Sequence, residues 1–266
     1  MKPGMRKLPL VMAVASAAGL LCFALLMERQ ARSAWPCGVD VPSRVTKPNL
    51  AIELVRLHAD VAKILGDPGT PEGILRRRAM GTIQYLDMPF IACYICLFIV
   101  IGLTLTLTPG QLDHLLGYAT IVLIALAGLF DFLEDWSILQ IVKLGSAAPE
   151  PGPIRAFALC KWGLFFLTLV LLSIWLLRWP RDQFQYWLFA VITGVGLLVA
   201  GMWGLTGVLI SERATSDLAI EMAITLAAPV IALLLVPRVL YVLSRDRAVD
   251  SKECEGVHDT RRDHRA

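Results

Sequence analysis

The sequence predicts an all-α, polytopic membrane helix bundle with six transmembrane helices and a short amphipathic helical segment between spans one and two. Of the 266 residues, 56% are hydrophobic and only 18% are charged, whereas soluble domains carry about 25% charged residues. The apolar residues also gather into runs near the roughly 20 residues that cross a bilayer. Six such runs occur, at 8–27, 88–108, 117–140, 157–177, 187–210 and 218–242.

The first run follows the basic stretch MKPGMRK. It is longer than the roughly 7–15 residues of a signal-peptide core, and no small-x-small cleavage site follows it. We therefore expect it to be a retained anchor. The sequence predicts four parts. Residues 1–27 form a cytoplasmic end with the first anchor, and residues 28–87 form an extracytoplasmic or interfacial helical segment. Residues 88–243 form a five-span membrane bundle, and residues 244–266 form a disordered cytoplasmic tail.

Within 28–87, NLAIELVRLHADVAKILG predicts one amphipathic helix, because its apolar residues fall on one stripe at four-then-three spacing. Asn49 is expected to cap its start and Gly66 to end it. After the turn DPGTPEG, Thr70 and Pro71 predict the N-cap and first position of a second helix. The segment is too small for a core of its own, so we expect it to lie on the membrane surface or to cap the bundle.

Orientation follows from Lys and Arg in short loops and tails. The amino end, the 178–186 loop and the tail after 242 carry most of these residues, and six spans place all three on one side. We therefore predict that both termini are cytoplasmic. The run Arg76–Arg78 stands against this orientation, although the rule weakens in a segment of about 60 residues.

The predicted third span contains FDFLEDW, with Asp131, Glu134 and Asp135. At 100° per residue all three side chains share one helix face. A charge near the bilayer centre costs roughly 2.5–3.5 kcal/mol. We therefore expect this face to point into the bundle, toward partners or water.

The predicted orientation brings other charged residues of the spans to the same, outer half of the membrane. The sequence thus predicts an outer-facing acidic pocket with no catalytic role, formed by Asp87, Asp131, Glu134, Asp135, Lys161 and Glu221. In one interpretation, it binds, and could transport, a small cationic or amphipathic solute or lipid. In the other, Lys161 pairs with Glu134 or Asp135 only to hold spans three and four in register, and the protein is a membrane scaffold.

The run Leu86-Asp87, the pattern Asp131-x-x-Glu134 and Lys161 resemble a loose group of uncharacterised bacterial polytopic inner-membrane proteins, over roughly residues 50–178. Their third span usually reads Asp-x-x-Glu-Asn, where this chain has Asp135 in place of Asn. The resemblance implies a bacterial inner (plasma) membrane and the pairing of spans two to four. It brings no known activity.

A third interpretation rests on Cys93 and Cys96, which form CYIC near the outer end of span two. A CxxC pair can serve a membrane thiol-disulfide oxidoreductase, and vitamin K epoxide reductase-like enzymes are similar in placing such a pair in a helix. Those enzymes also need shuttle cysteines outside the membrane, where this chain offers only Cys37.

No cofactor and no metal site is predicted. The sequence has no HExxH pattern, no paired CxxC motifs and no glycine-rich phosphate loop, although acidic side chains can hold a hard cation. It has no basic, aromatic-rich stretch for nucleic acid. The expected partners are the lipid bilayer, a small-molecule or lipid ligand, and a second copy of the chain. The second copy would bind through the small residues of span five, unless these pack against span six. The small residues are Gly196, Ala200 and Gly204.

Overall fold

The computed structural model describes residues 3–36, 45–108, 110–144, 150–178, 184–210 and 216–231. Every regular element in these ranges is a helix. The helices are α1 (Pro3–Ala34), α2 (Pro48–Glu53), α3 (His58–Leu65), α4 (Pro71–Thr106), α5 (Gln111–Leu144), α6 (Gly152–Leu177) and α7 (Phe184–Leu209). Residues 216–231 form a further helical stretch.

Five helices of the described ranges are long and apolar enough to cross a membrane, which makes the chain an all-helical multi-pass membrane protein. They are Val11–Ala34, Pro71–Thr106, Gln111–Leu144, Gly152–Leu177 and Trp187–Leu209. A sixth span is not confirmed, since the helical stretch 216–231 covers only part of the expected 218–242. The remainder of that run, Cys37 and the predicted tail 244–266 lie outside the described residues.

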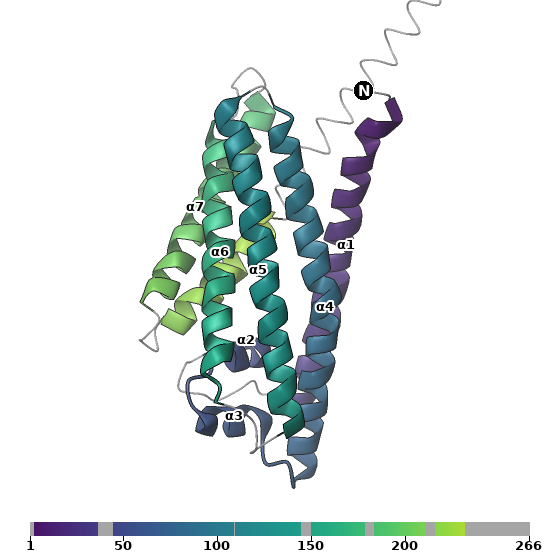
Figure 1. The fold of residues 1–266 in the computed structure, drawn as a ribbon, viewed down its shortest axis with the longest axis vertical. Coiled ribbons are helices and arrows are strands. Elements are labelled where there is room, and N and C mark those ends of the chain that lie inside the picture. Colours follow the sequence, from purple (N-terminus) through teal and green to yellow (C-terminus); the bar gives the residue numbers. More distant parts are fainter. Residues whose placement is uncertain are drawn as a thin grey trace, which may run out of the picture.

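The long helices stand side by side, and the two short helices lie at one end of the bundle (Figure 1). α4 packs against both α1 and α5, and α6 packs against both α5 and α7. The chain starts at the end of α1 that lies away from α2 and α3 (Figure 1). The short helices therefore cap one end of the bundle, as one of the two expected placements had it.

α1 continues to Ala34, and α4 begins at Pro71, as expected for the second helix that runs toward span two. The prediction of one amphipathic helix is wrong. The chain leaves the helix after α2, and the carbonyl of Leu54 accepts a hydrogen bond from Arg155 of α6. In a continuing helix, this carbonyl would instead accept a hydrogen bond from the backbone N–H of the residue four positions later. Leu57, one of the apolar residues of the expected stripe, lies in the link between α2 and α3 and is 62% exposed.

The capping residues of α3 and α4 agree with the prediction. Gly66 ends α3 with a φ of 71°, a conformation that glycine adopts without steric cost. Thr70 is the N-cap of α4, and its side chain accepts a hydrogen bond from the Gly73 N–H at 3.1 Å. Pro71 takes the first helical position.

The predicted cap of α2 is wrong, because this helix begins at Pro48 and its N-cap is Lys47 rather than Asn49. Proline is well suited to the first position of a helix, where its missing N–H costs no hydrogen bond. Asn49 lies inside the first turn and lines a cavity described below.

The small residues of α7 allow close packing within the chain. A Cβ atom on Gly196 would lie 3.0 Å from Val230, and one on Gly204 would lie 2.4 Å from the ring of Phe166 in α6. The glycines thus face α6 and the 216–231 stretch. The contact with Val230 is the packing of span five against the expected span six, which is the alternative to a dimer contact. Association of two copies stays a prediction.

Candidate functional site

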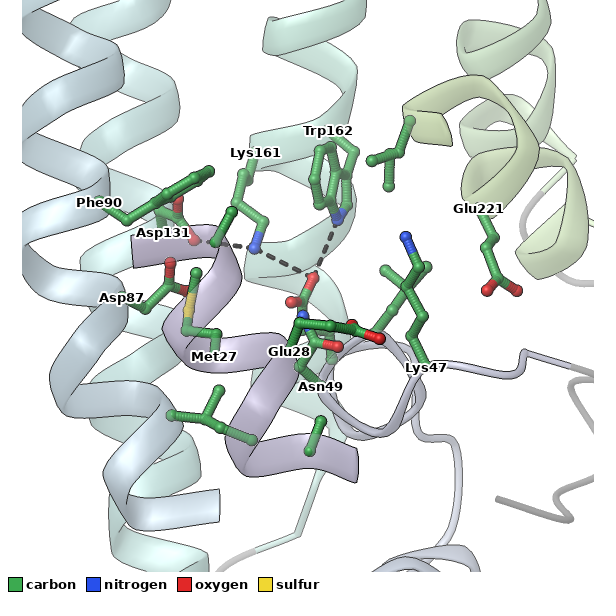
Figure 2. Close-up of a pocket in the computed structure, with 16 residues that line it drawn as sticks. Met27, Glu28, Lys47, Asn49, Asp87, Phe90, Asp131, Lys161, Trp162 and Glu221 are labelled. Carbon is green, nitrogen blue, oxygen red and sulfur yellow. Dashed lines mark hydrogen bonds and ion pairs between the residues drawn. The ribbon is translucent and has the colours of Figure 1, made fainter. Parts of the chain in front are cut away.

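The centre of the candidate site is Lys161 of α6, which is buried. Its Nζ atom lies 2.8 Å from Asp131 Oδ1, 2.8 Å from Glu134 Oε2 and 3.1 Å from Glu53 Oε2. Figure 2 shows the bond between Lys161 and Asp131. The contacts with Asp131 and Glu53 are hydrogen bonds that the ammonium group donates, and the contact with Glu134 is an ion pair. We name these four residues the lysine cluster.

The lysine cluster joins α5, α6 and α2. The predicted pairing of Lys161 with Glu134 occurs, whereas Asp135 lies outside the range of an ion pair with Lys161. Asp131 is held on its other side too, because the hydroxyl of Tyr94 donates a hydrogen bond to Asp131 Oδ2 at 2.9 Å. α4 therefore contributes to the same polar network through Tyr94.

Glu53, at the end of α2, is the member that sequence reasoning missed. It is buried, and its Oε2 accepts hydrogen bonds from Lys161 and, at 3.0 Å, from the indole N–H of Trp162. Burial raises the pKa of the Glu53 carboxyl above its ordinary value, although the charge of Lys161 opposes this. The only signal in the sequence was an acidic residue inside the apolar run LAIELV.

Two further acidic residues lie beside the lysine cluster. They are Asp87 and Asp135. Each of these residues, and Asp131 of the lysine cluster, has one carboxylate oxygen that lies within 4.8 Å of the other two. Asp131 belongs to both groups. The predicted convergence of α4, α5 and α6 on one acidic region therefore occurs, with Glu53 of α2 added to it.

A cavity of about 260 Å³ opens beside these residues. Helices α1, α2, α4, α5 and α6 and the 216–231 stretch contribute to its wall. Figure 2 shows Lys161 directed at Asp131, while Glu221 lies apart from them on the other side of the cavity. The charged residues that line it are Glu28, Lys47, Glu53, Asp87, Asp131, Lys161 and Glu221, and two aromatic residues, Phe90 and Trp162, join them.

Four of the six predicted site residues line this cavity: Asp87, Asp131, Lys161 and Glu221. Glu134 and Asp135 do not, since both are buried within the bundle on α5. Glu28 and Lys47 were not predicted. Both lie in or next to the segment whose helix boundaries differ from those expected, so their place on the cavity wall was not visible in the apolar pattern.

Glu221 also ties the 216–231 stretch to the start of α2. Its carboxylate accepts hydrogen bonds from the backbone N–H of Thr46 at 3.2 Å and from the Thr46 hydroxyl at 2.6 Å. Thr46 lies two positions before Pro48, where α2 begins. These two hydrogen bonds fix the position of the Glu221 carboxylate in the cavity wall.

A second ionic group lies at the same end of the bundle. Asp217 is fully buried, and its carboxylate binds Arg155 at 3.0 Å and Arg56 at 3.3 Å. These contacts join the 216–231 stretch, the first turn of α6 and the link between α2 and α3. This group was not predicted, because its three members lie far apart in the chain.

Cys93 lies where α4 meets α1. Its Sγ atom is 2.6 Å from the position that a Cβ atom on Gly19 would take, so the missing side chain of Gly19 makes room for it. Cys93 and Cys96 are both free thiols in the structure. Cys93 thus has a packing contact, and the thiol-disulfide interpretation stays a prediction.

No protein family model, curated protein or solved structure matches this chain. The chemistry of the site therefore has to be judged from its own geometry.

Proposed function

We propose that this protein is an integral inner-membrane protein that binds a small cationic or amphipathic solute in its acidic cavity and could move it across the bilayer. The observation that supports this is the charge of the cavity wall. Five carboxyl groups line the cavity against two ammonium groups. Buried acidic groups need counter-charges, because an isolated charge in a low-dielectric surrounding is costly.

The size and the aromatic residues of the cavity favour a small organic cation. Its volume of about 260 Å³ lies just below the range of about 300–1,000 Å³ usual for ligand pockets. Phe90 and Trp162 line the cavity, and the face of the Trp162 ring already meets a cation there, since Lys161 Nζ lies 4.8 Å from the ring centroid. Such faces, with carboxylates nearby, recognise quaternary ammonium groups.

We further propose that both termini are cytoplasmic in a bacterial cell, as the charge of the short loops and tails indicates. The end of the bundle that α2 and α3 cap then faces outward, and the cavity next to α2 opens toward that side. Binding from outside requires this orientation.

The proposal is tested by calorimetric titration of the purified full-length protein in detergent with tetramethylammonium. Wild type should bind it, and Glu53→Gln should weaken binding about tenfold, since losing one charged contact costs about 1.4 kcal/mol. The affinity of wild type should rise with pH as Glu53 loses its proton, which happens above the usual range because its pKa is raised. Glu53→Gln should lack that part of the pH dependence.

Glu72→Gln is the matched control, because Glu72 is an exposed residue at the start of α4 that pairs with Arg76. It should bind tetramethylammonium as wild type does. Absence of binding to folded wild type, or equal affinities of the Glu53→Gln and Glu72→Gln proteins, would contradict the proposed function.

A scaffold role is the second candidate. Three apolar residues at the capped end are exposed, namely Leu57, Ile74 and Leu75, and a partner protein could cover them. In this case the lysine cluster serves only to fix the packing of α2, α5 and α6. A stable, stoichiometric partner that co-purifies with wild type and is lost with Leu57→Ser would favour this role.

A further inference from the structure

We infer that Asp87, Asp131 and Asp135 form a binding site for a divalent cation of calcium's size. This site goes beyond the proposed function, since the ligand is a bare metal ion. It also rests on Asp135, which is not among the residues that line the cavity. Figure 2 shows Asp87 and Asp131 at the α4 and α5 side of the cavity, which gives an ion a route of entry.

The spacing of the three carboxylates fits one coordination shell. Their oxygen atoms lie within 4.8 Å of one another. Calcium binds oxygens at about 2.3–2.6 Å in flexible shells of carboxylate and amide groups, so oxygens within 4.8 Å of one another can share one ion. Magnesium demands near-ideal octahedral geometry and keeps several of its waters, so a buried set of protein oxygens suits calcium better. Asp131 and Asp135 are one turn apart on α5, which directs both toward Asp87 of α4.

Besides the two oxygens of Glu134, which forms an ion pair with Lys161, two buried oxygen atoms in this region lack a hydrogen-bond partner among the described residues. Asp135 is 1% exposed and its Oδ2 accepts no hydrogen bond. Gln84 lies one turn before Asp87 on α4, is 2% exposed, and its carbonyl Oε1 is likewise unpartnered. Buried polar atoms in proteins are nearly always paired. Carboxylate and amide oxygens are calcium ligands, so a bound ion would satisfy atoms that the protein itself leaves unpaired.

The distribution of charge also points to a cation. Lys161 donates hydrogen bonds to Glu53 and Asp131 and forms an ion pair with Glu134. Asp87 and Asp135 thus share one region with Asp131 but receive no contact from that ammonium group. Each carboxylate oxygen of Asp131 has two lone pairs. Asp131 can therefore keep its bonds to Lys161 and Tyr94 and still bind an ion, whose double charge balances Asp87 and Asp135.

The test is a calorimetric titration with Ca²⁺ of the metal-free, full-length protein in detergent, repeated with Mg²⁺. Wild type should bind one Ca²⁺ per chain, and bind Mg²⁺ at least tenfold more weakly. Asp135→Asn should weaken Ca²⁺ binding at least tenfold. Ca²⁺ should also raise the unfolding temperature of wild type, since a ligand of the folded state stabilises it, and should not raise that of Asp135→Asn.

Asp113→Asn is the control, because Asp113 lies in the first turn of α5, more than five turns away from Asp135. It should bind Ca²⁺ as wild type does. If Asp135→Asn does not fold, Asp87→Asn takes its place with the same expected loss. Absence of Ca²⁺ binding to wild type, or an unchanged affinity in the variant, overturns the site.

The same proteins separate this site from the proposed function. Glu53→Gln should weaken tetramethylammonium binding about tenfold and keep Ca²⁺ binding, because Glu53 belongs to the cavity wall and not to the three carboxylates. Loss of Ca²⁺ binding in Asp135→Asn is expected whether or not tetramethylammonium binds. A protein that binds one probe and not the other would overturn one proposal and leave the other standing.

Discussion

Replacing Lys161 by Met is expected to lower the free energy of unfolding by about 3–5 kcal/mol, because removing one partner of a buried ion pair leaves its counter-charge unpaired. Here three carboxylates lose their shared ammonium group at once: Glu53, Asp131 and Glu134. Methionine fills a similar volume, so lost packing contributes little. Thermal unfolding of the detergent-purified protein, followed by tryptophan fluorescence, measures the effect.

Lys143→Met is the control, since Lys143 is exposed in the last turn of α5. Its unfolding temperature should stay close to that of wild type. If the Lys161→Met protein is as stable as this control, the three carboxyl groups do not depend on the ammonium group, and the lysine cluster does not hold α2, α5 and α6 together.

The second large effect is expected for Asp217→Asn, at about 2–3 kcal/mol, because hydrogen bonds to charged groups contribute about 1.5–3 kcal/mol each. Asparagine keeps the shape of the side chain but removes the charge that Arg56 and Arg155 face. Both arginines are partly exposed and can reach water, so the loss is smaller than for Lys161. The same thermal unfolding measurement applies.

Asp113→Asn serves as the control for this change. Asp113 pairs with Arg178 at 3.9 Å, and both side chains are partly exposed, so its loss should cost little. The Asp217→Asn protein should also be cleaved faster by protease near Arg56, since that link loses a buried anchor. Equal stability and equal cleavage of the two variants would show that the Asp217 group does not fasten the capping segment.

The helices that span the membrane were predictable because each depends on a local pattern. Apolar length alone indicates the long helices, and the caps at Thr70 and Gly66 depend on residues within one turn of each other. The sharing of one face by Asp131 and Glu134 follows from helix periodicity. The extension of α1 to Ala34 was not predictable in this way, since a polar helix end beyond the apolar run carries no hydropathy signal.

The missed residues are those whose role depends on contacts between distant parts of the chain. Glu53 is an acidic residue inside the apolar run LAIELV, and at the end of α2 its carboxylate accepts hydrogen bonds from Lys161 and Trp162. At the break after α2, the Leu54 carbonyl accepts a hydrogen bond from Arg155, a contact between parts of the chain about 100 residues apart. Asp217 was missed for the same reason.

The acidic cavity is examined most directly by the reaction rates of one engineered thiol. Asn49→Cys, in a protein without native cysteines, places a thiol on the cavity wall. A cationic, trimethylammonium-bearing thiosulfonate should label it from outside intact cells at least about tenfold faster than an anionic sulfonate-bearing one, since a charged cleft raises the local concentration of its counter-ion. Each rate is divided by the rate of the same reagent with a free thiol. Equal rates, or faster labelling by the anionic reagent, would contradict an outward-facing acidic cavity.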